Sequence, residues 1–250
     1  MSHPFDEQFL SLIKEQTETK WRTYQPLTFE EFLAQHKTSC IWQPNTQWSG
    51  LTEEEIVALE QRWSVRFPPD YRAFLSILHC LDRPVTIATY DGDTRKIIPC
   101  DAPLFQNWNR DSQTIEHAYQ QINEDISYEV LQNNLWKPGW GRKPVTKYGQ
   151  KQQIELLLAN APRLIPIYGH RFLLAEPMQA GNPILSFQRA DIVMYAPDLY
   201  AFFCKDFSDI LDLDQAELKK IAIESQRISQ ERYSFYKTIP FWGELITKIS

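Results

Sequence analysis

Residues 50–75, GLTEEEIVALEQRWSVRFPPDYRAFL, contain the strongest secondary-structure signals in this chain. Thr52 is followed three residues later by Glu55, the spacing of a capping box, in which two side chains satisfy backbone N–H groups at a helix start. Pro68 and Pro69 interrupt the helix that follows, and Pro69 is suited to the first turn of a second helix. The stretch therefore predicts a helical hairpin whose apolar faces pack against the rest of the chain.

Two further helices are predicted on the N-terminal side of this hairpin. Apolar residues recur at helical spacing from Phe5 to Ile13, which indicates an amphipathic helix near the start of the chain. Thr28 and Glu31 repeat the capping-box spacing and predict a second, short helix. Residues 39–50, rich in Pro, Asn and Trp, predict a loop.

The middle of the chain predicts a β-hairpin, helical segments and a long loop. Val85–Ala88 and Ile97–Ile98 are β-favouring runs on either side of Asp91-Gly92, a dipeptide typical of hairpin turns. Helical spacing returns in two stretches over residues 115–131. Residues 136–150, WKPGWGRKPVTKYGQ, then predict a long loop.

Four consecutive strands are predicted after a short helix at residues 154–158. The runs RLIPIYG, RFLLAE, PILSFQ and DIVMYA, between Arg163 and Ala196, are short and separated by turn residues, as in an antiparallel meander. Helical patterns follow from Pro197, from Asp214 to about Arg232, and from Pro240 to Ile249. Because the strands cluster, we expect an α+β fold with a central, mostly antiparallel sheet flanked by N-terminal and C-terminal helices.

Composition and charge limit the classes of function. The 250 residues (29.5 kDa), of which 43% are hydrophobic, fit a single domain over 1–250 with its own core. Lys and Arg number 26 against 32 Asp and Glu, and this net charge of −6 disfavours nucleic acid and anionic membranes and favours a basic partner. The four cysteines lack CxxC spacing, and we see no leader or membrane-spanning run, so we expect a cytoplasmic protein with reduced thiols.

No motif for a common catalytic or cofactor site is present in the sequence. The eight glycines never form the phosphate loops G-x-G-x-x-G or G-x-x-x-x-G-K-[ST], nor the G-x-S-x-G turn of a hydrolase. The five histidines include no H-x-x-x-H pair for zinc. We interpret Asp91 and Asp93 as turn residues, Asp70 as a carboxylate that stabilises a helix start, and His79 as a packed ring or a dipole partner near a helix end. We therefore expect no catalytic residue, metal or cofactor.

Two groups of residues are candidates for binding a partner protein. Trp136, Trp140 and Arg142 share one loop and belong to the residue types that anchor interfaces, although this loop could equally fold back as a lid over the sheet. His170 and Arg171 lie between two predicted strands, where they are either exposed donors for a partner or solvated turn residues.

An acidic pair gives a third candidate contact, and an enzyme is a separate hypothesis. Glu53 and Glu54 could bind a basic partner, or could serve only as first-turn charges favoured by the helix dipole. A hydrolase or small-ligand enzyme could be assembled from the scattered residues Asp70, His170 and Arg171, if the fold brings them together.

Residues 50–60 and 67–75 together closely resemble the opening signature of the SUKH superfamily. Further segments agree with larger members of that superfamily: Trp140–Pro144, Leu164–Phe172, Gly181–Phe187, Asp191–Tyr195 and the ending Pro240–Ile246. The resemblance covers about residues 48–204, with helices in 1–47 and 205–250 as extensions. The chain departs from many members at His79–Asp82, where they place Asn-Gly after the second helix.

The resemblance implies an α+β fold, no catalytic residues and a function in binding other proteins. The superfamily includes the fungal cell-wall-assembly regulator and many bacterial immunity proteins, which typically neutralise a cognate toxin, often a nuclease. A nuclease must attract phosphate and so has a basic site, towards which a chain of net charge −6 is steered.

The leading hypothesis is therefore an immunity protein that binds and blocks a basic toxin domain. The alternative is an adaptor or regulator of cell-wall or envelope synthesis that acts through protein contacts. The residues expected at the interface are Trp136, Trp140, Arg142, Tyr168, His170, Arg171, Glu53 and Glu54.

Overall fold

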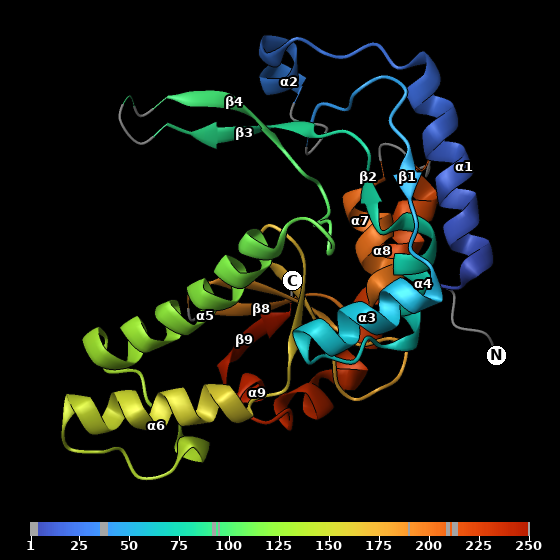
Figure 1. Cartoon of the computed structure of the whole chain (residues 1–250). Helices are drawn as coiled ribbons and strands as arrows, with labels where there is room; N and C mark the ends of the chain where they lie inside the picture. Colours follow the sequence, from blue (N-terminus) through green and yellow to red (C-terminus); the bar gives the residue numbers. More distant parts are fainter. Residues whose placement is uncertain are drawn as a thin grey trace.

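The computed structural model describes residues 5–35, 40–91, 94, 96–189, 191–208, 211 and 215–249. These residues form an α+β fold, as expected, in which helices cover both faces of a five-stranded sheet (Figure 1). A two-stranded hairpin projects from this body, and a second, shorter pair of strands lies beside the N-terminal helices.

The helical hairpin predicted from residues 50–75 forms as α3 (Glu53–Trp63) and α4 (Pro69–Leu78). Thr52 Oγ1 accepts a hydrogen bond from Glu55 N (3.3 Å), and the Glu55 carboxylate accepts one from Thr52 N (2.8 Å), which completes the capping box. Gly50 lies against α4 so closely that a Cβ at this position would be 2.1 Å from Ser76 O. Glycine is therefore required where the chain enters the hairpin.

The N-terminal helices pack beside this pair. In α1 (Glu7–Thr23), the side chain of Asp6 accepts a hydrogen bond from Phe9 N (3.0 Å) and caps the helix. The helix therefore begins after Phe5, although the spacing of apolar residues predicted that Phe5 is helical. α2 (Phe29–Gln35) forms at the predicted Thr28 cap. Within the loop predicted over residues 39–50, Trp48–Ser49 form the strand β1. This strand pairs with β2 (Cys80–Leu81), which follows α4.

The predicted meander is confirmed as four antiparallel strands of the central sheet. They are β5 (Leu164–Tyr168), β6 (Arg171–Leu174), β7 (Ile184–Gln188) and β8 (Asp191–Ala196). β9 (Ile246–Ile249) adds a fifth strand parallel to β8.

The prediction of a C-terminal helix from Pro240 to Ile249 is wrong beyond Leu245. Only α9 (Trp242–Leu245) is helical, and the backbone then enters β9. Apolar residues at 242, 245, 246 and 249 suit either a helix face or a short strand. The open edge of β8 settles the conformation, because it offers unpaired backbone groups to the final segment.

The two faces of the sheet belong to two hydrophobic cores. Ile165 faces the core made with α1, α3, α4 and α7 (Leu199–Asp206), whereas its neighbour Leu164 faces the core made with α5 (Ser112–Gln132), α6 (Lys147–Asn160) and the C-terminal segment. This alternation follows from the two-residue repeat of a strand. α5 is one continuous helix where the sequence indicates two helical stretches.

The long loop predicted over residues 136–150 is shorter than expected. It contains the 3-10 turn η1 (Pro138–Trp140), and α6 already begins at Lys147. Thr146 supplies the missed start signal, because its hydroxyl accepts a hydrogen bond from Gly149 N (3.1 Å). Residues 147–150 are therefore helical, which corrects the prediction.

The remaining elements are the last long helix and the projecting hairpin. α8 (Gln215–Lys237) follows α7, for which Asp198 rather than Pro197 provides the cap by accepting a hydrogen bond from Ala201 N (2.9 Å). β3 (Val85–Tyr90) and β4 (Ile97–Ala102) form the predicted hairpin. Gly92 and Asp93 of its predicted turn lie outside the described residues.

Candidate functional site

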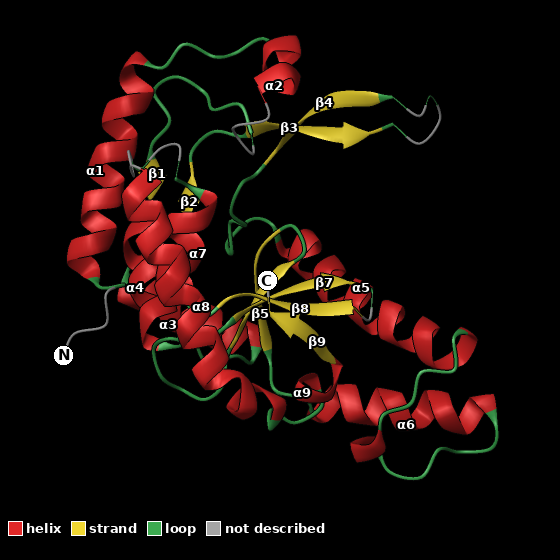
Figure 2. Cartoon of the chain, turned by 180° about the vertical axis from the view of Figure 1, so that it is seen from behind, coloured by secondary structure: helices red, strands yellow, loops and turns green. Residues whose placement is uncertain are grey.

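The β3–β4 hairpin exposes an unusual amount of apolar side chain. It projects beyond the body of the molecule in two opposite views (Figures 1 and 2). Val85 at its base is buried, but further out Tyr90 is 71% exposed, Ile97 49% and Ile98 39%. Because neighbouring strand residues point to opposite faces, Ile97 and Ile98 make both faces of the outer hairpin apolar. Exposed apolar side chains on a projecting hairpin make it a candidate interaction site.

The backbone of β4 is poorly suited to pairing with another strand. Thr86 exchanges both of its backbone hydrogen bonds with Ile41 (2.8 and 3.0 Å), so the backbone groups of Thr86 point away from β4. By the alternation of an antiparallel ladder, Ile97, Pro99 and Asp101 of β4 then direct their backbone groups to its outer edge. Pro99 has no N–H to donate there. The hairpin therefore offers its side chains, more than its backbone, for contact with another molecule.

A cavity of about 250 Å³ connects the base of the hairpin to the central sheet. Val85 and Ile87 line it from the hairpin, and Tyr168, Gly169 and Asp206 line it from the body. Tyr168, a residue predicted to bind a partner, thus lies next to the base of the hairpin.

Tyr168 belongs to a compact polar cluster built around the carboxylate of Asp206. This carboxylate, at the end of α7 and 6% exposed, accepts hydrogen bonds from the hydroxyls of Tyr168 and Tyr195, the latter at 2.5 Å. Arg171 Nε lies 3.6 Å from Asp206 Oδ2, and the guanidinium covers the rings of Tyr168 and Tyr195 at 4.9 and 4.3 Å from their centroids. Lys205 Nζ lies 3.9 Å from the centroid of the Tyr195 ring. The cluster is therefore a rigid set of aromatic rings and cations.

The protonation of this cluster follows from its burial. Burial, together with the Asp206 charge, raises the pKa of Tyr195 to about 12 and also raises that of Tyr168. Both phenols therefore remain hydroxyl donors at neutral pH. His170 lies in the β5–β6 turn with part of its side chain exposed. The covered part of its ring and the charge of Arg171 lower its pKa, so the imidazole is uncharged at pH 7.

The loop between α5 and α6 folds back over the C-terminal segment. Trp140 is 2% exposed and stacks on Phe241 with ring centroids 5.2 Å apart. Trp136 packs edge-on against Trp140 at 5.8 Å and is half-buried, whereas Arg142 is exposed. The sequence left two alternatives for this loop: an exposed interface, or a lid that folds back. Trp140 is buried, as in a loop that folds back, whereas Trp136 and Arg142 remain at the surface.

The remaining predicted residues lie apart from the polar cluster. Glu53 and Glu54 are both exposed in the first turn of α3, and Glu53 forms an ion pair with Arg72. Hydrogen bonds with its own backbone N–H and with Thr52 lower the pKa of Glu54. The predicted residues thus form three separate groups: Tyr168 with His170 and Arg171, the Trp136–Arg142 loop, and the α3 acidic pair.

The three residues of the enzyme hypothesis do not converge. The buried Asp70 accepts a hydrogen bond from Gly181 N (2.8 Å), in the loop that follows β6, whereas Arg171 begins β6. Asp70 and Arg171 therefore lie towards opposite ends of that strand. Among the described residues, no group of three or more His, Cys, Asp or Glu is placed to hold a metal ion.

The exposure of the outer hairpin and the partners of Arg171 were not predicted from the sequence. Ile97 and Ile98 are predicted only as strand residues, and Tyr90 lies beyond the predicted run Val85–Ala88. A signal was available, because adjacent apolar residues at 97 and 98 cannot both face the core of a hairpin. No local signal could have linked Asp206 to Tyr168, 38 residues earlier.

Comparisons with known proteins identify one relationship. A family model described as the SMI1 / KNR4 family (SUKH-1) matches residues 50–213, which run from the start of the helical hairpin to beyond α7. No curated protein and no solved structure matches the chain. Within the described part of the chain, no helix is long and apolar enough to span a bilayer.

Proposed function

Because this chain belongs to the SMI1/KNR4 family (SUKH-1), we propose that it is an immunity protein, which binds and neutralises a cognate toxin. The family is consistent with a toxin-immunity or regulator module and is generally non-catalytic. The observation that carries the proposal is the β3–β4 hairpin, which exposes apolar side chains at its outer end and shares a cavity with Tyr168 and Asp206 at its base.

This surface has the composition of a protein interface. Tyr90, Ile97 and Ile98 supply apolar area, while Arg171 and the tyrosines of the cluster supply the aromatic and Arg contacts that dominate many binding energies. Hydrogen bonds to Asp206 already hold the cluster in place, so little side-chain entropy is lost when a partner binds. The net charge of −6 favours a basic toxin, such as a nuclease.

The proposal is tested by growth of the host while it expresses the C-terminal domain of the large protein encoded next to this gene. Coexpression of this chain should restore growth, and the two proteins should copurify as a stable complex. The variant Tyr90→Thr/Ile97→Thr/Ile98→Thr should weaken the complex about 100-fold, because three exposed apolar side chains lose roughly 1 kcal/mol of burial each.

A matched control removes exposed apolar side chains elsewhere. Leu12, Ile223 and Phe235 are 49%, 58% and 46% exposed on helices, and replacing all three by Gln should leave binding and rescue unchanged. Absence of toxicity, or toxicity without rescue or binding, would favour the adaptor or regulator of envelope synthesis. Equal binding by the hairpin variant and the control would exclude the hairpin as the interface.

A further inference from the structure

Positive charge is concentrated in one short segment of this acidic chain. Residues 133–151, here called the basic segment, contain five of the 26 Lys and Arg residues and none of the 32 Asp and Glu residues. Its cationic residues are Lys137, Arg142, Lys143, Lys147 and Lys151. The segment comprises the loop after α5 and the first turns of α6, at the opposite end of the molecule from the β3–β4 hairpin (Figures 1 and 2).

Three of these five cations have no hydrogen-bond or ion-pair partner among the residues that the structure describes. Arg142 and Lys147 are exposed and Lys137 is partly exposed, and none of the three side chains forms a hydrogen bond or ion pair with the described residues. Lys143 donates to Asn134, and Lys151 forms an ion pair with Glu155 at 3.8 Å. At least three positive charges are therefore available to a binding partner.

The loop that presents these charges is held firmly to the body. The buried Trp140 stacks on Phe241, and Gly139 N donates a hydrogen bond to Glu244 (2.8 Å). Trp136 Nε1 donates to Gly141 O (2.9 Å) and so closes the turn beside Arg142. Because the loop is already ordered, little conformational entropy is lost when a partner binds.

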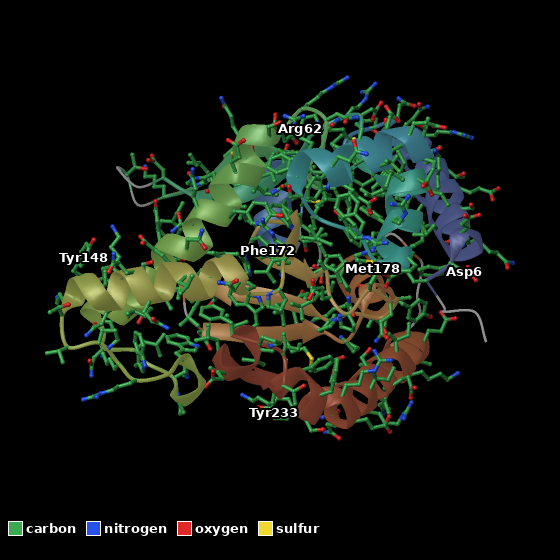
Figure 3. The ribbon with its side chains drawn as sticks, turned by 60° about the horizontal axis from the view of Figure 1, so that its bottom comes forward. Asp6, Arg62, Tyr148, Phe172, Met178 and Tyr233 are labelled. Carbon is green, nitrogen blue, oxygen red and sulfur yellow. The ribbon has the colours of Figure 1, made fainter. Side chains whose placement is uncertain are left out.

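Apolar side chains are exposed beside the cations. Val145 is 96% exposed and Tyr148 is 72% exposed, and Figure 3 shows Tyr148 at the outer end of α6. Lys147 precedes Tyr148 and Lys151 follows it within one turn of α6, and an exposed tyrosine between two lysines is suited to a protein surface that combines acidic and apolar groups.

We propose that the basic segment binds an acidic surface of a partner protein and forms a second binding site, separate from the hairpin. Charge complementarity favours this partner over a nucleic acid, because a long polyanion would meet the field of α5, which packs against α6. α5 carries no Lys or Arg and four acidic residues: Glu116, Glu124, Asp125 and Glu129. Arg142 was predicted from the sequence to contact a basic toxin. As part of the basic segment, it is better suited to an acidic surface of a partner protein.

The test measures binding of the intact chain to a short fluorescent oligo-L-glutamate peptide by anisotropy, because a protein surface presents only a few carboxylates at one place. The variant Lys137→Gln/Arg142→Gln/Lys147→Gln should weaken binding about tenfold. Each exposed charge contact contributes only modestly to the binding free energy, and the loss of all three together amounts to roughly that factor. Binding should also weaken as salt is raised, since exposed charges are screened. The hairpin variant Tyr90→Thr/Ile97→Thr/Ile98→Thr should bind this peptide as wild type does, so the two proposed sites are tested independently.

A control of equal net charge shows whether position matters. Arg66, Lys219 and Lys220 are exposed outside the basic segment, and replacing all three by Gln should leave the affinity for the short oligo-L-glutamate peptide within about twofold of wild type. Equal losses in the two variants, or no binding by wild type, would overturn the proposal. Tighter binding of single-stranded DNA or of phosphatidylserine vesicles through the same three cations would also overturn it, in favour of those ligands.

Discussion

Replacing Asp70 should destabilise the protein far more than its position in the first turn of α4 suggests. The residue is 3% exposed, and its carboxylate accepts hydrogen bonds from Tyr71 N (3.0 Å) and Gly181 N (2.8 Å). Gly181 is buried between β6 and β7, and its carbonyl in turn accepts a hydrogen bond from Arg232 in α8 (2.8 Å). The carboxylate therefore links α4 to the central sheet and, through Gly181, to α8.

The size of the effect follows from these contacts. An exposed carboxylate at a helix start contributes about 0.3–1 kcal/mol. A hydrogen bond to a buried charged group contributes about 1.5–3 kcal/mol, and removing the acceptor also leaves the Gly181 N–H buried without a partner. We therefore expect Asp70→Ala to lower the free energy of unfolding by about 3–5 kcal/mol. Asp70→Asn keeps one carbonyl acceptor and should have an intermediate effect.

Urea denaturation followed by far-ultraviolet circular dichroism measures this difference through the transition midpoint. Glu54→Ala provides the control, because Glu54 is an exposed first-turn carboxylate of α3 and its removal should shift the midpoint much less. If Asp70→Ala shifted the midpoint no further than Glu54→Ala, the hydrogen bond to Gly181 would not contribute to stability, and the reasoning would be refuted.

Two other predictions concern buried rings. Trp140→Ala should lower the free energy of unfolding by about 3–5 kcal/mol, because the side chain is 2% exposed and stacks on Phe241; an unchanged urea midpoint would contradict its place in the core. Burial lowers the pKa of His79 to about 4, while the unfolded histidine titrates near 6.5. Between these two values only the unfolded chain binds the proton, so stability should fall by up to about 3 kcal/mol as pH drops from 6.5 to 4. His79→Gln should remove this part of the pH dependence. Identical dependence of unfolding free energy on pH in the variant and the wild type would argue against a lowered pKa of His79.

Local patterns account for most of the secondary structure. The capping box at Thr52 and Glu55 and the prolines before α4 act over a few residues, so they predict the helical hairpin directly. The four strands between residues 163 and 196 are short β-favouring runs with turn residues between them, and they form the expected meander. Their order also places Tyr168, His170 and Arg171 close together, because a two-residue turn joins β5 to β6.

The remaining features depend on contacts between distant parts of the chain. Ile246–Ile249 becomes a strand because β8 has an open edge, and Trp140 is buried because Phe241, a hundred residues later, stacks on it. Asp70 joins α4 to Gly181, and Asp206 gathers Tyr168 and Tyr195, through hydrogen bonds that no local pattern records. Apolar sequence shows that a side chain favours burial, but which surfaces meet depends on how the elements pack together. For this reason the sequence predicts the helices, the sheet, the β-hairpin and the family resemblance, whereas the burial of Trp140, the Asp70 and Asp206 hydrogen bonds and the position of the hairpin beside Tyr168 are apparent only in the folded chain.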